Sequence, residues 1–188
     1  MGNHVLFRWL LGWLMPPRVS ALKLSMTPGM TEYYNSKFVA QDILVPAAKT
    51  GECIELMHDI FEIYPLWLCA HKVIRTRLGT MLDVEPEYDL RTQHLQGDTP
   101  AAQMYVDVGI WSTPAPILRG EEYNLQAAVD TMEAWLIDNH GYQALYAVTQ
   151  LSEDGFWRMF DKALYARVRR KYGGETAFFD VYRKVGKR

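Results

Sequence analysis

Two largely apolar stripes of identical spacing, each set between strand-like runs, most constrain what this chain can fold into. In both stripes the residues recur at intervals of four, three and four, which places them on one face of an α-helix. The sequence therefore predicts two amphipathic helices. The stripes are Thr50, Ile54, Met57 and Phe61 in the first helix, and Leu125, Val129, Met132 and Leu136 in the second.

Four runs with strand character flank these helices, at residues 38–45, 64–69, 104–109 and 142–148. Pro46 suits the first position of a helix, Asn124 suits the cap of the second helix, and Gly141 suits its end. Two βαβ units separated by a long loop normally close into a four-stranded antiparallel sheet with both helices on one face. We therefore expect an α+β fold with a ferredoxin-like βαββαβ arrangement, followed by a carboxy-terminal helical segment.

We expect the chain to divide into three parts: an aromatic segment and linker at 1–36, the ferredoxin-like domain at 37–150, and basic helices at 151–188. Within the domain, residues 72–102 show no sustained period and contain glycines and prolines, which predicts a long surface loop. In the last part, Ser152 suits the start of a helix that reaches Phe160. Residues 164–171 and 176–184 also have helical character.

The formal net charge of -2 hides an asymmetry between the two ends of the chain. Residues 158–188 hold ten basic and three acidic residues, a net +7, so the remainder, with ten basic and nineteen acidic residues, is -9. A basic end can bind anionic lipid headgroups, an acidic partner or nucleic acid, although a solvated helix face is the commoner reason. Nucleic acid is not expected, because the predicted third strand carries Asp107 where RNA-binding sheets carry basic residues.

An apolar run that contains two tryptophans occupies residues 5–15. Arg8 interrupts it, Met15-Pro16-Pro17 supplies no small-residue cleavage site, and the run is too short to span a bilayer. We therefore expect neither a signal peptide nor a transmembrane segment here. The run suits a helix that lies in a membrane interface, making peripheral membrane contact, and equally an aromatic helix buried against a neighbouring domain.

The sequence lacks the motifs that cradle phosphates or build the common hydrolase sites. Its five histidines are scattered over unlike contexts, and Cys53 and Cys69 belong to no metal-ligand pattern, so no metal site is expected. Aromatic residues make up 13% of the chain and allow two interpretations. They form ordinary core packing, which composition alone favours, or they line a pocket for a large apolar ligand at Trp67, Tyr105 and Tyr146.

Alternation along the third strand gives a sharper prediction. Successive strand residues point to opposite faces, so if the apolar positions face the helices, Tyr105 and Asp107 face away from them. Tyr142 and Tyr146 are assigned to the same side by their polar hydroxyls. We expect Tyr105, Asp107 and Tyr146 to converge on an open or partly open concavity. The apolar positions of this alternation are Met104, Val106 and Val108.

Several ordered stretches resemble the Delta(24)-sterol reductases, a family of flavin-dependent sterol side-chain reductases. The resemblance spans nearly the whole chain, which makes it more specific than any short motif. One departure is Ala70, which stands where the family has proline. The path of the chain after the second strand is expected to differ there, so no family role is assigned to His71. The matching stretches are WLMPP at 13–17, VSALK at 19–23, DILVP at 42–46, YPLWLC at 64–69, QGD at 96–98, QMYVDVG at 103–109, LRGEE at 118–122, NHGYQ at 139–143 and FWRMF at 156–160.

This resemblance implies the substrate side of an FAD enzyme of the vanillyl-alcohol-oxidase type, which uses NADPH to saturate a sterol side-chain double bond at the endoplasmic reticulum membrane. The flavin would be bound mainly by an amino-terminal domain that this chain lacks, so we expect inactivity in isolation. Candidate proton donors are Tyr105, Asp107 and Tyr146; candidate substrate-binding residues are Trp67, Tyr142 and Arg119.

Two further expectations concern partners. The alternative to an enzyme component is a non-catalytic sterol-binding or partner-binding fragment or paralogue, which would associate with the missing flavin domain or with a full-length reductase. The basic segment 167–171 is similar to the calmodulin-binding region of plant members, although a basic amphipathic helix is weak evidence by itself.

Overall fold

The computed structural model describes residues 4–14, 25–74, 80–82, 84 and 102–186 of the chain. These form two compact units, residues 1–36 and 37–188. The first unit contains α1 (Val5–Leu11), the 3-10 turn Gly12–Leu14 and most of α3 (Pro28–Lys37), and none of the residues of either α-helix is buried. Within the described residues, no helix is both long enough and apolar enough to cross a membrane.

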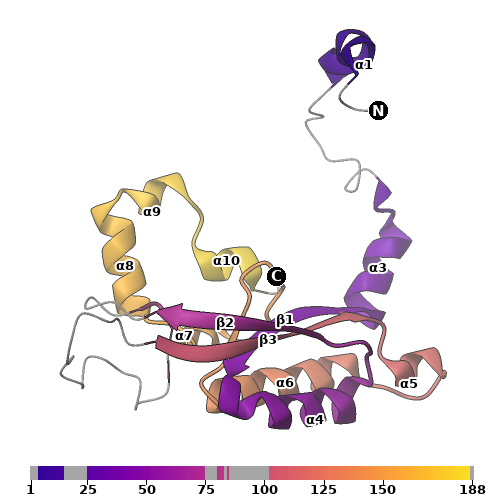
Figure 1. Ribbon diagram of the computed structural model, residues 1–188, viewed down its shortest axis with the longest axis vertical. Coiled ribbons are helices and arrows are strands. Elements are labelled where there is room, and N and C mark those ends of the chain that lie inside the picture. Colours follow the sequence, from indigo (N-terminus) through magenta and orange to yellow (C-terminus); the bar gives the residue numbers. More distant parts are fainter. Residues whose placement is uncertain (1–3, 15–24, 75–79, 83, 85–101, 187–188) are drawn as a thin grey trace. The chain divides into compact units, whose positions relative to one another are not determined.

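The second unit is built on a four-stranded sheet in the order β2-β3-β1-β4, with every neighbouring pair antiparallel (Figure 1). The expected α+β class with an antiparallel sheet is confirmed, and the first and third strands are central as expected. The finer assignment to the ferredoxin-like arrangement stays a prediction. The strands are β1 (Val39–Pro46), β2 (Trp67–Ile74), β3 (Ala102–Ser112) and β4 (Tyr142–Gln143).

Two helices, α4 (Thr50–Phe61) and α6 (Leu125–Asp138), cover one face of this sheet (Figure 1). Their predicted stripes are largely correct, with Thr50, Ile54 and Leu125 only half-buried. Met104, expected beneath the helices, is 47% exposed, because β2 and β3 run past the ends of α4 and α6 (Figure 1). The core at this face consists of Ile43, Val45, Cys53, Met57, Phe61, Val108, Ile110, Val129, Met132 and Leu136.

The ends of α6 show how local chemistry fixes a helix. The Asn124 side chain accepts from the Ala127 backbone N–H at 3.0 Å, which confirms the predicted cap. At the other end, His140 rather than Gly141 adopts the left-handed conformation, with φ 52°. Gly141 is needed for close approach, because a Cβ there would lie 2.3 Å from Leu136 Cδ1 and 3.0 Å from the Leu44 carbonyl oxygen.

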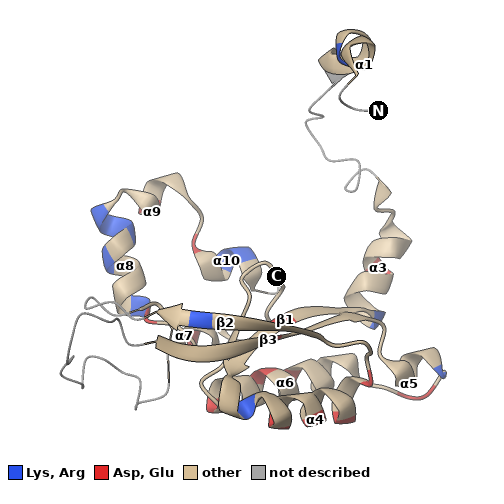
Figure 2. Ribbon diagram, viewed as in Figure 1, with Lys and Arg blue, Asp and Glu red and all other residues tan. Residues whose placement is uncertain are grey.

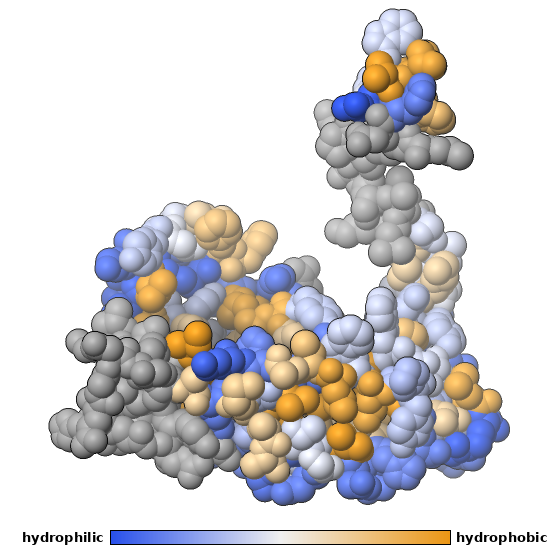
Figure 3. Space-filling view, in the orientation of Figure 1, coloured by the Kyte–Doolittle hydropathy of each residue, from blue (hydrophilic) through white to orange (hydrophobic). Residues whose placement is uncertain are grey.

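The strands β2 and β4 differ from their predicted ranges. β2 begins at Trp67 after a cis Tyr64-Pro65 peptide and continues to Ile74, exposed over most of its length at the sheet edge (Figure 3). The expected loop 72–102 is therefore shorter, and most of it lies outside the described residues. β4 pairs only through Tyr142 and Gln143, and the chain then turns instead of continuing as a strand to residue 148.

Four short helices follow, α7 (Glu153–Arg158), α8 (Lys162–Lys171), α9 (Gly174–Ala177) and α10 (Val181–Val185). Ser152 caps α7 as predicted, its hydroxyl accepting from the Gly155 N–H at 3.1 Å. The helix expected at 176–184 is divided, because the Asp180 carboxylate accepts from the N–H groups of residues 182 and 183 and starts α10 afresh. Phe156 and Phe160 of this region help to bury the aromatic side chains on the second face of the sheet.

Candidate functional site

Two carboxylates lie near each other on the sheet face opposite α4 and α6. Asp107 of β3 pairs with Leu44 of β1, and Asp42 of β1 pairs with Gly109 of β3. Paired residues share a face, so Asp42 and Asp107 are diagonal neighbours on adjacent strands. This arrangement confirms the predicted facing of Asp107, whereas Asp42 was not singled out from the sequence.

Burial and a neighbouring charge perturb the Asp107 carboxyl group. It is half-buried, and its Oδ1 has no hydrogen-bond partner among the described residues. Desolvation and, second, the negative charge of Asp42 together raise its pKa to about 6, against a smaller opposing effect of His71. A carboxyl group with a pKa in this range holds or releases a proton near neutral pH, as a general acid must.

Tyr146 joins this pair through its hydroxyl group, which donates to Asp42 Oδ2. Its side chain is on a turn rather than on the predicted fourth strand, and the residue is 66% exposed. Desolvation of the hydroxyl, and then its bond to Asp42, raise the pKa of Tyr146 above its ordinary value. The hydroxyl therefore stays protonated at neutral pH and is tied to one of the two carboxylates.

Tyr105 faces the same side as Asp107 but does not open onto it. Its side chain is fully buried, its hydroxyl donates to the His140 carbonyl oxygen at 3.0 Å, and its ring lies 5.6 Å from that of Tyr142. Tyr142 is buried as well, and its ring lies 6.3 Å from that of Phe160. The expected convergence of three side chains on one concavity is therefore wrong for Tyr105, because aromatic packing covers that part of the face.

The burial of Tyr142 also affects its hydroxyl group. Desolvation, with a smaller contribution from the Asp107 charge, raises the pKa of Tyr142 to about 12. Tyr105 has no exposed surface and Tyr142 is 9% exposed, so this conformation offers a ligand little of either side chain. Their catalytic and substrate-binding roles remain predictions.

Trp67 lies beside the carboxylate pair on the edge strand β2 and is 66% exposed. It pairs with Gly109, where a Cβ would lie 3.1 Å from the Trp67 Cβ and 2.5 Å from Asp42 Oδ1. Gly109 therefore leaves the space that the Asp42 carboxylate occupies. A glycine inside an alternating strand is a sequence signal for such close approach, and it marks a site residue that the motif analysis missed.

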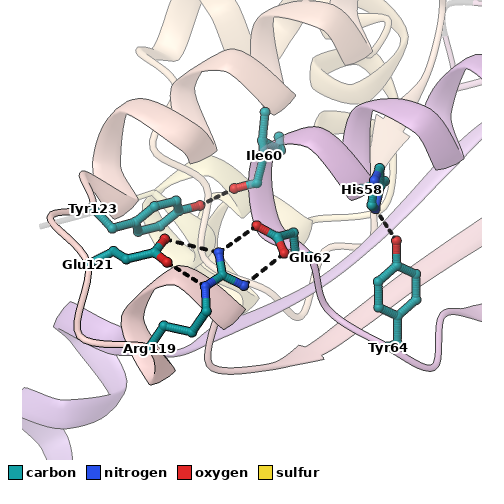
Figure 4. A network of polar contacts seen from close by, with 7 residues as sticks. All are labelled: His58, Ile60, Glu62, Tyr64, Arg119, Glu121 and Tyr123. Atoms are coloured by element: carbon teal, nitrogen blue, oxygen red, sulfur yellow. Dashed lines mark hydrogen bonds and ion pairs between the residues drawn. The ribbon is translucent and has the colours of Figure 1, made fainter.

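Arg119 lies elsewhere, in the loop after α5 (Ala115–Leu118), at the end of α4 (Figure 4). Its guanidinium group donates two hydrogen bonds of 2.9 Å to the Glu62 carboxylate and also bonds Glu121. These bonds lower the pKa values of both glutamates. Since the guanidinium group already bonds two carboxylates, the geometry favours a structural role in which Arg119 links its loop to the end of α4. The sterol contact expected of Arg119 stays a prediction.

The flavin implied by the resemblance can be tested against this face. The described residues offer no glycine-rich phosphate cradle, but the orphaned Asp107 oxygen and the exposed Trp67 and Tyr146 fit a cover over the reacting end of a flavin and an apolar substrate. No group of three histidine, cysteine or acidic side chains in the described part of the chain is placed to hold a metal ion.

The chain is similar over nearly all its length to several proteins named Delta(24)-sterol reductase. It is 47% identical to the Pisum sativum protein, 46% to that of Arabidopsis thaliana and 31% to that of Homo sapiens, each over 186 residues or 99% of this chain. The chain spans about a third of the length of these relatives, 32%, 33% and 32% respectively. No family model matches the chain, and no solved structure matches it.

Proposed function

We propose that this chain, which corresponds to a carboxy-terminal part of the Delta(24)-sterol reductase family, forms the substrate side of a sterol-reducing site and supplies its proton donor, Asp107. The observation that carries the proposal is the carboxyl group of Asp107, whose pKa is raised to about 6 on a partly exposed sheet face. Supporting it, the relatives that match 98–99% of the chain are named as reductases of this class, one of them as a homolog.

The chemistry requires such a donor. An isolated alkene resists hydride attack, so a proton must reach one alkene carbon as hydride reaches the other. The bound flavin, reduced by NADPH and held mainly by a portion outside this chain, would supply the hydride. What remains for this chain is to place an acid beside an apolar substrate and to raise the pKa of that acid toward neutrality.

The residues of the face divide this work. Asp107 would hold the proton at its carboxyl group, whose pKa is raised by burial and, second, by the negative charge of Asp42. Tyr146 binds Asp42 through its hydroxyl and presents an exposed ring, while Trp67 adds an apolar wall. A sterol side chain, which lacks polar groups, would contact these rings through dispersion and hydrophobic burial.

The test is a chimera in which this chain replaces the matching third of the pea relative. Asp107→Asn should lower the rate of sterol reduction by about 100-fold or more, because general acids contribute that much. The rate of the unsubstituted chimera should fall as the pH rises above about 6, through the pKa of Asp107. Asp59→Asn, an exposed acid on α4, is the matched control and should leave the rate unchanged. An active chimera that is indifferent to Asp107→Asn would remove the acid assignment.

A second candidate function is a non-catalytic sterol-binding or partner-binding module. It is favoured by one observation, the exposed rings of Trp67 and Tyr146, which would contact an apolar ligand or a partner without any chemistry. Sterol binding by the isolated chain, together with an inactive chimera, would support it. Calmodulin binding at residues 167–171 and attachment to the endoplasmic reticulum membrane also remain proposals from the resemblance.

A further inference from the structure

The helices α8 and α9 form an arm that projects from the sheet (Figure 1), and hydrophobic side chains show at its outer end (Figure 3). Three aromatic residues that follow these two helices are strongly exposed. Tyr172 is 73% exposed, Phe178 is 74% exposed and Phe179 is 90% exposed. A phenylalanine that is nine-tenths exposed gains almost nothing from folding of this chain, although burial of its ring is among the larger stabilising contributions available to a side chain. These rings are therefore available to something outside the described structure.

Hydrogen bonds within the arm hold the backbone of Phe178 and Phe179 in the conformation that exposes their rings. The Arg169 guanidinium donates to the Phe179 carbonyl oxygen at 3.1 Å and to the Phe178 carbonyl oxygen at 2.6 Å. It also lies 5.3 Å from the centre of the Tyr165 ring, and the Tyr165 hydroxyl accepts from the Val181 N–H at 2.9 Å. The backbone of the two phenylalanines is thus held inward by hydrogen bonds while their rings project outward.

The charge around these rings has one dominant sign (Figure 2). α8 carries five basic residues and no acidic residue. The nearby Glu175 lies 3.9 Å from Arg170, and Lys171 lies over the Tyr172 ring at 5.2 Å. Exposed aromatic rings beside several cations are typical of segments that insert at the headgroup level of anionic bilayers, whereas the centres of protein interfaces are depleted in charge.

We propose that Tyr172, Phe178 and Phe179 insert into the headgroup region of an anionic lipid bilayer, with Arg167, Arg170 and Lys171 on the lipid phosphates. Because the rings sit on a projecting tip, they can enter a lipid surface without any rearrangement of the sheet. Arg169 acts as a positioning residue, since its donors are directed to backbone carbonyls rather than outward. This inference does not depend on the proposed role of Asp107.

The test is cosedimentation of the full chain with phosphatidylcholine vesicles that contain roughly one third phosphatidylserine. Phe178→Ser with Phe179→Ser should weaken binding by about tenfold or more, since two apolar rings are removed from the bilayer. Arg167→Gln, Arg170→Gln and Lys171→Gln together should weaken it by about 100-fold, and pure phosphatidylcholine should bind poorly. Leu118→Ser, an exposed apolar residue of α5, and Lys49→Gln are matched controls.

The measurement is repeated in a background with Trp9→Ser and Trp13→Ser, because α1 is also apolar and exposed. The same losses in both backgrounds, with an unchanged thermal unfolding midpoint, are the expected result. Binding that ignores the phenylalanine substitutions and follows charge alone would overturn the proposal in favour of a general anion surface, such as one for an acidic protein. Binding that disappears entirely in the Trp9/Trp13 background would also overturn it.

Discussion

Truncation of Glu133 to alanine should strongly destabilise the chain, because this carboxyl group organises the buried end of the sheet. It is 1% exposed on α6, and its Oε1 accepts from Gln143 Nε2 at 3.0 Å, Thr149 Oγ1 at 3.0 Å and the Gln150 N–H at 2.8 Å. Glu133→Ala removes the acceptor shared by three donors, of which Gln143 Nε2 keeps a second acceptor, Gln41 Oε1 at 3.2 Å. Each buried unsatisfied group costs about 1–3 kcal/mol, and a water entering the space would recover part of this. We expect a loss of about 3 kcal/mol or more.

Glu133→Gln distinguishes the contribution of the hydrogen bonds to stability from the contribution of the ionisable carboxyl group. Glutamine keeps the Oε1 acceptor, so we expect it to stay within about 1 kcal/mol of the unsubstituted chain. Burial raises the pKa of Glu133. The folded state therefore holds the proton more tightly than the unfolded chain, and the stability present at acidic pH declines as the pH rises through the folded pKa. The glutamine variant should lack that decline.

Urea unfolding followed by circular dichroism, at acidic and at neutral pH, measures both effects. The denaturant slope should stay constant, so that midpoints report free energies of unfolding directly. Glu55→Ala, an exposed glutamate on α4, is the matched control and should change stability by less than about 0.5 kcal/mol. A Glu133→Ala variant as stable as this control would refute the reasoning.

Three other predictions use the same unfolding assay or carboxyl NMR titration. Gly141→Ala should cost about 2–4 kcal/mol, because its Cβ would lie 2.3 Å from Leu136 Cδ1, whereas Gly51→Ala, with no atom within 4 Å, should be neutral or stabilising by up to about 1 kcal/mol. The raised pKa of Asp107 makes the folded state hold its proton more tightly than the unfolded chain, so the stability of the unsubstituted chain should decline between pH 3.8 and about 6. Asp107→Asn should remove this decline, and equal pH profiles of stability for the two proteins would count against the reasoning. Asp42→Asn should lower the pKa of Asp107 toward its ordinary value, and an unchanged titration would show that burial alone sets it.

Period and alternation predicted the elements that bury a continuous face. The buried positions of α4 and α6 follow from helical spacing, and the facing of Asp107 follows from the two-residue repeat of β3. These predictions succeed because each depends on one element and its nearest layer. The predicted burial of Met104 was wrong, because burial also depends on how far the helices extend along the strand, and no local sequence pattern contains that information.

Residues of the site were harder to predict, because their environment depends on strand register. Asp42 and Asp107 are far apart in the sequence, and only the β1–β3 pairing makes them neighbours. Likewise, nothing local shows that α7 and the residues after it would help to bury Tyr105 and Tyr142. The sequence therefore indicated which face of the sheet Asp107 occupies, but not which side chains of that face would stay accessible.

The early end of β4 places Tyr146 at the site. Two consecutive residues of β1 hold the following turn: Gln41 Nε2 donates to the Val148 carbonyl oxygen at 2.8 Å, and the Asp42 carbonyl accepts from the Ala144 N–H at 2.9 Å. Adjacent strand residues point to opposite faces. The Gln41 side chain therefore bonds the turn on the helix side of the sheet, while the Asp42 carboxylate accepts a hydrogen bond from the Tyr146 hydroxyl on the other side. The turn leaves the tyrosine ring exposed and its hydroxyl bonded to the carboxylate that, together with burial, raises the pKa of Asp107.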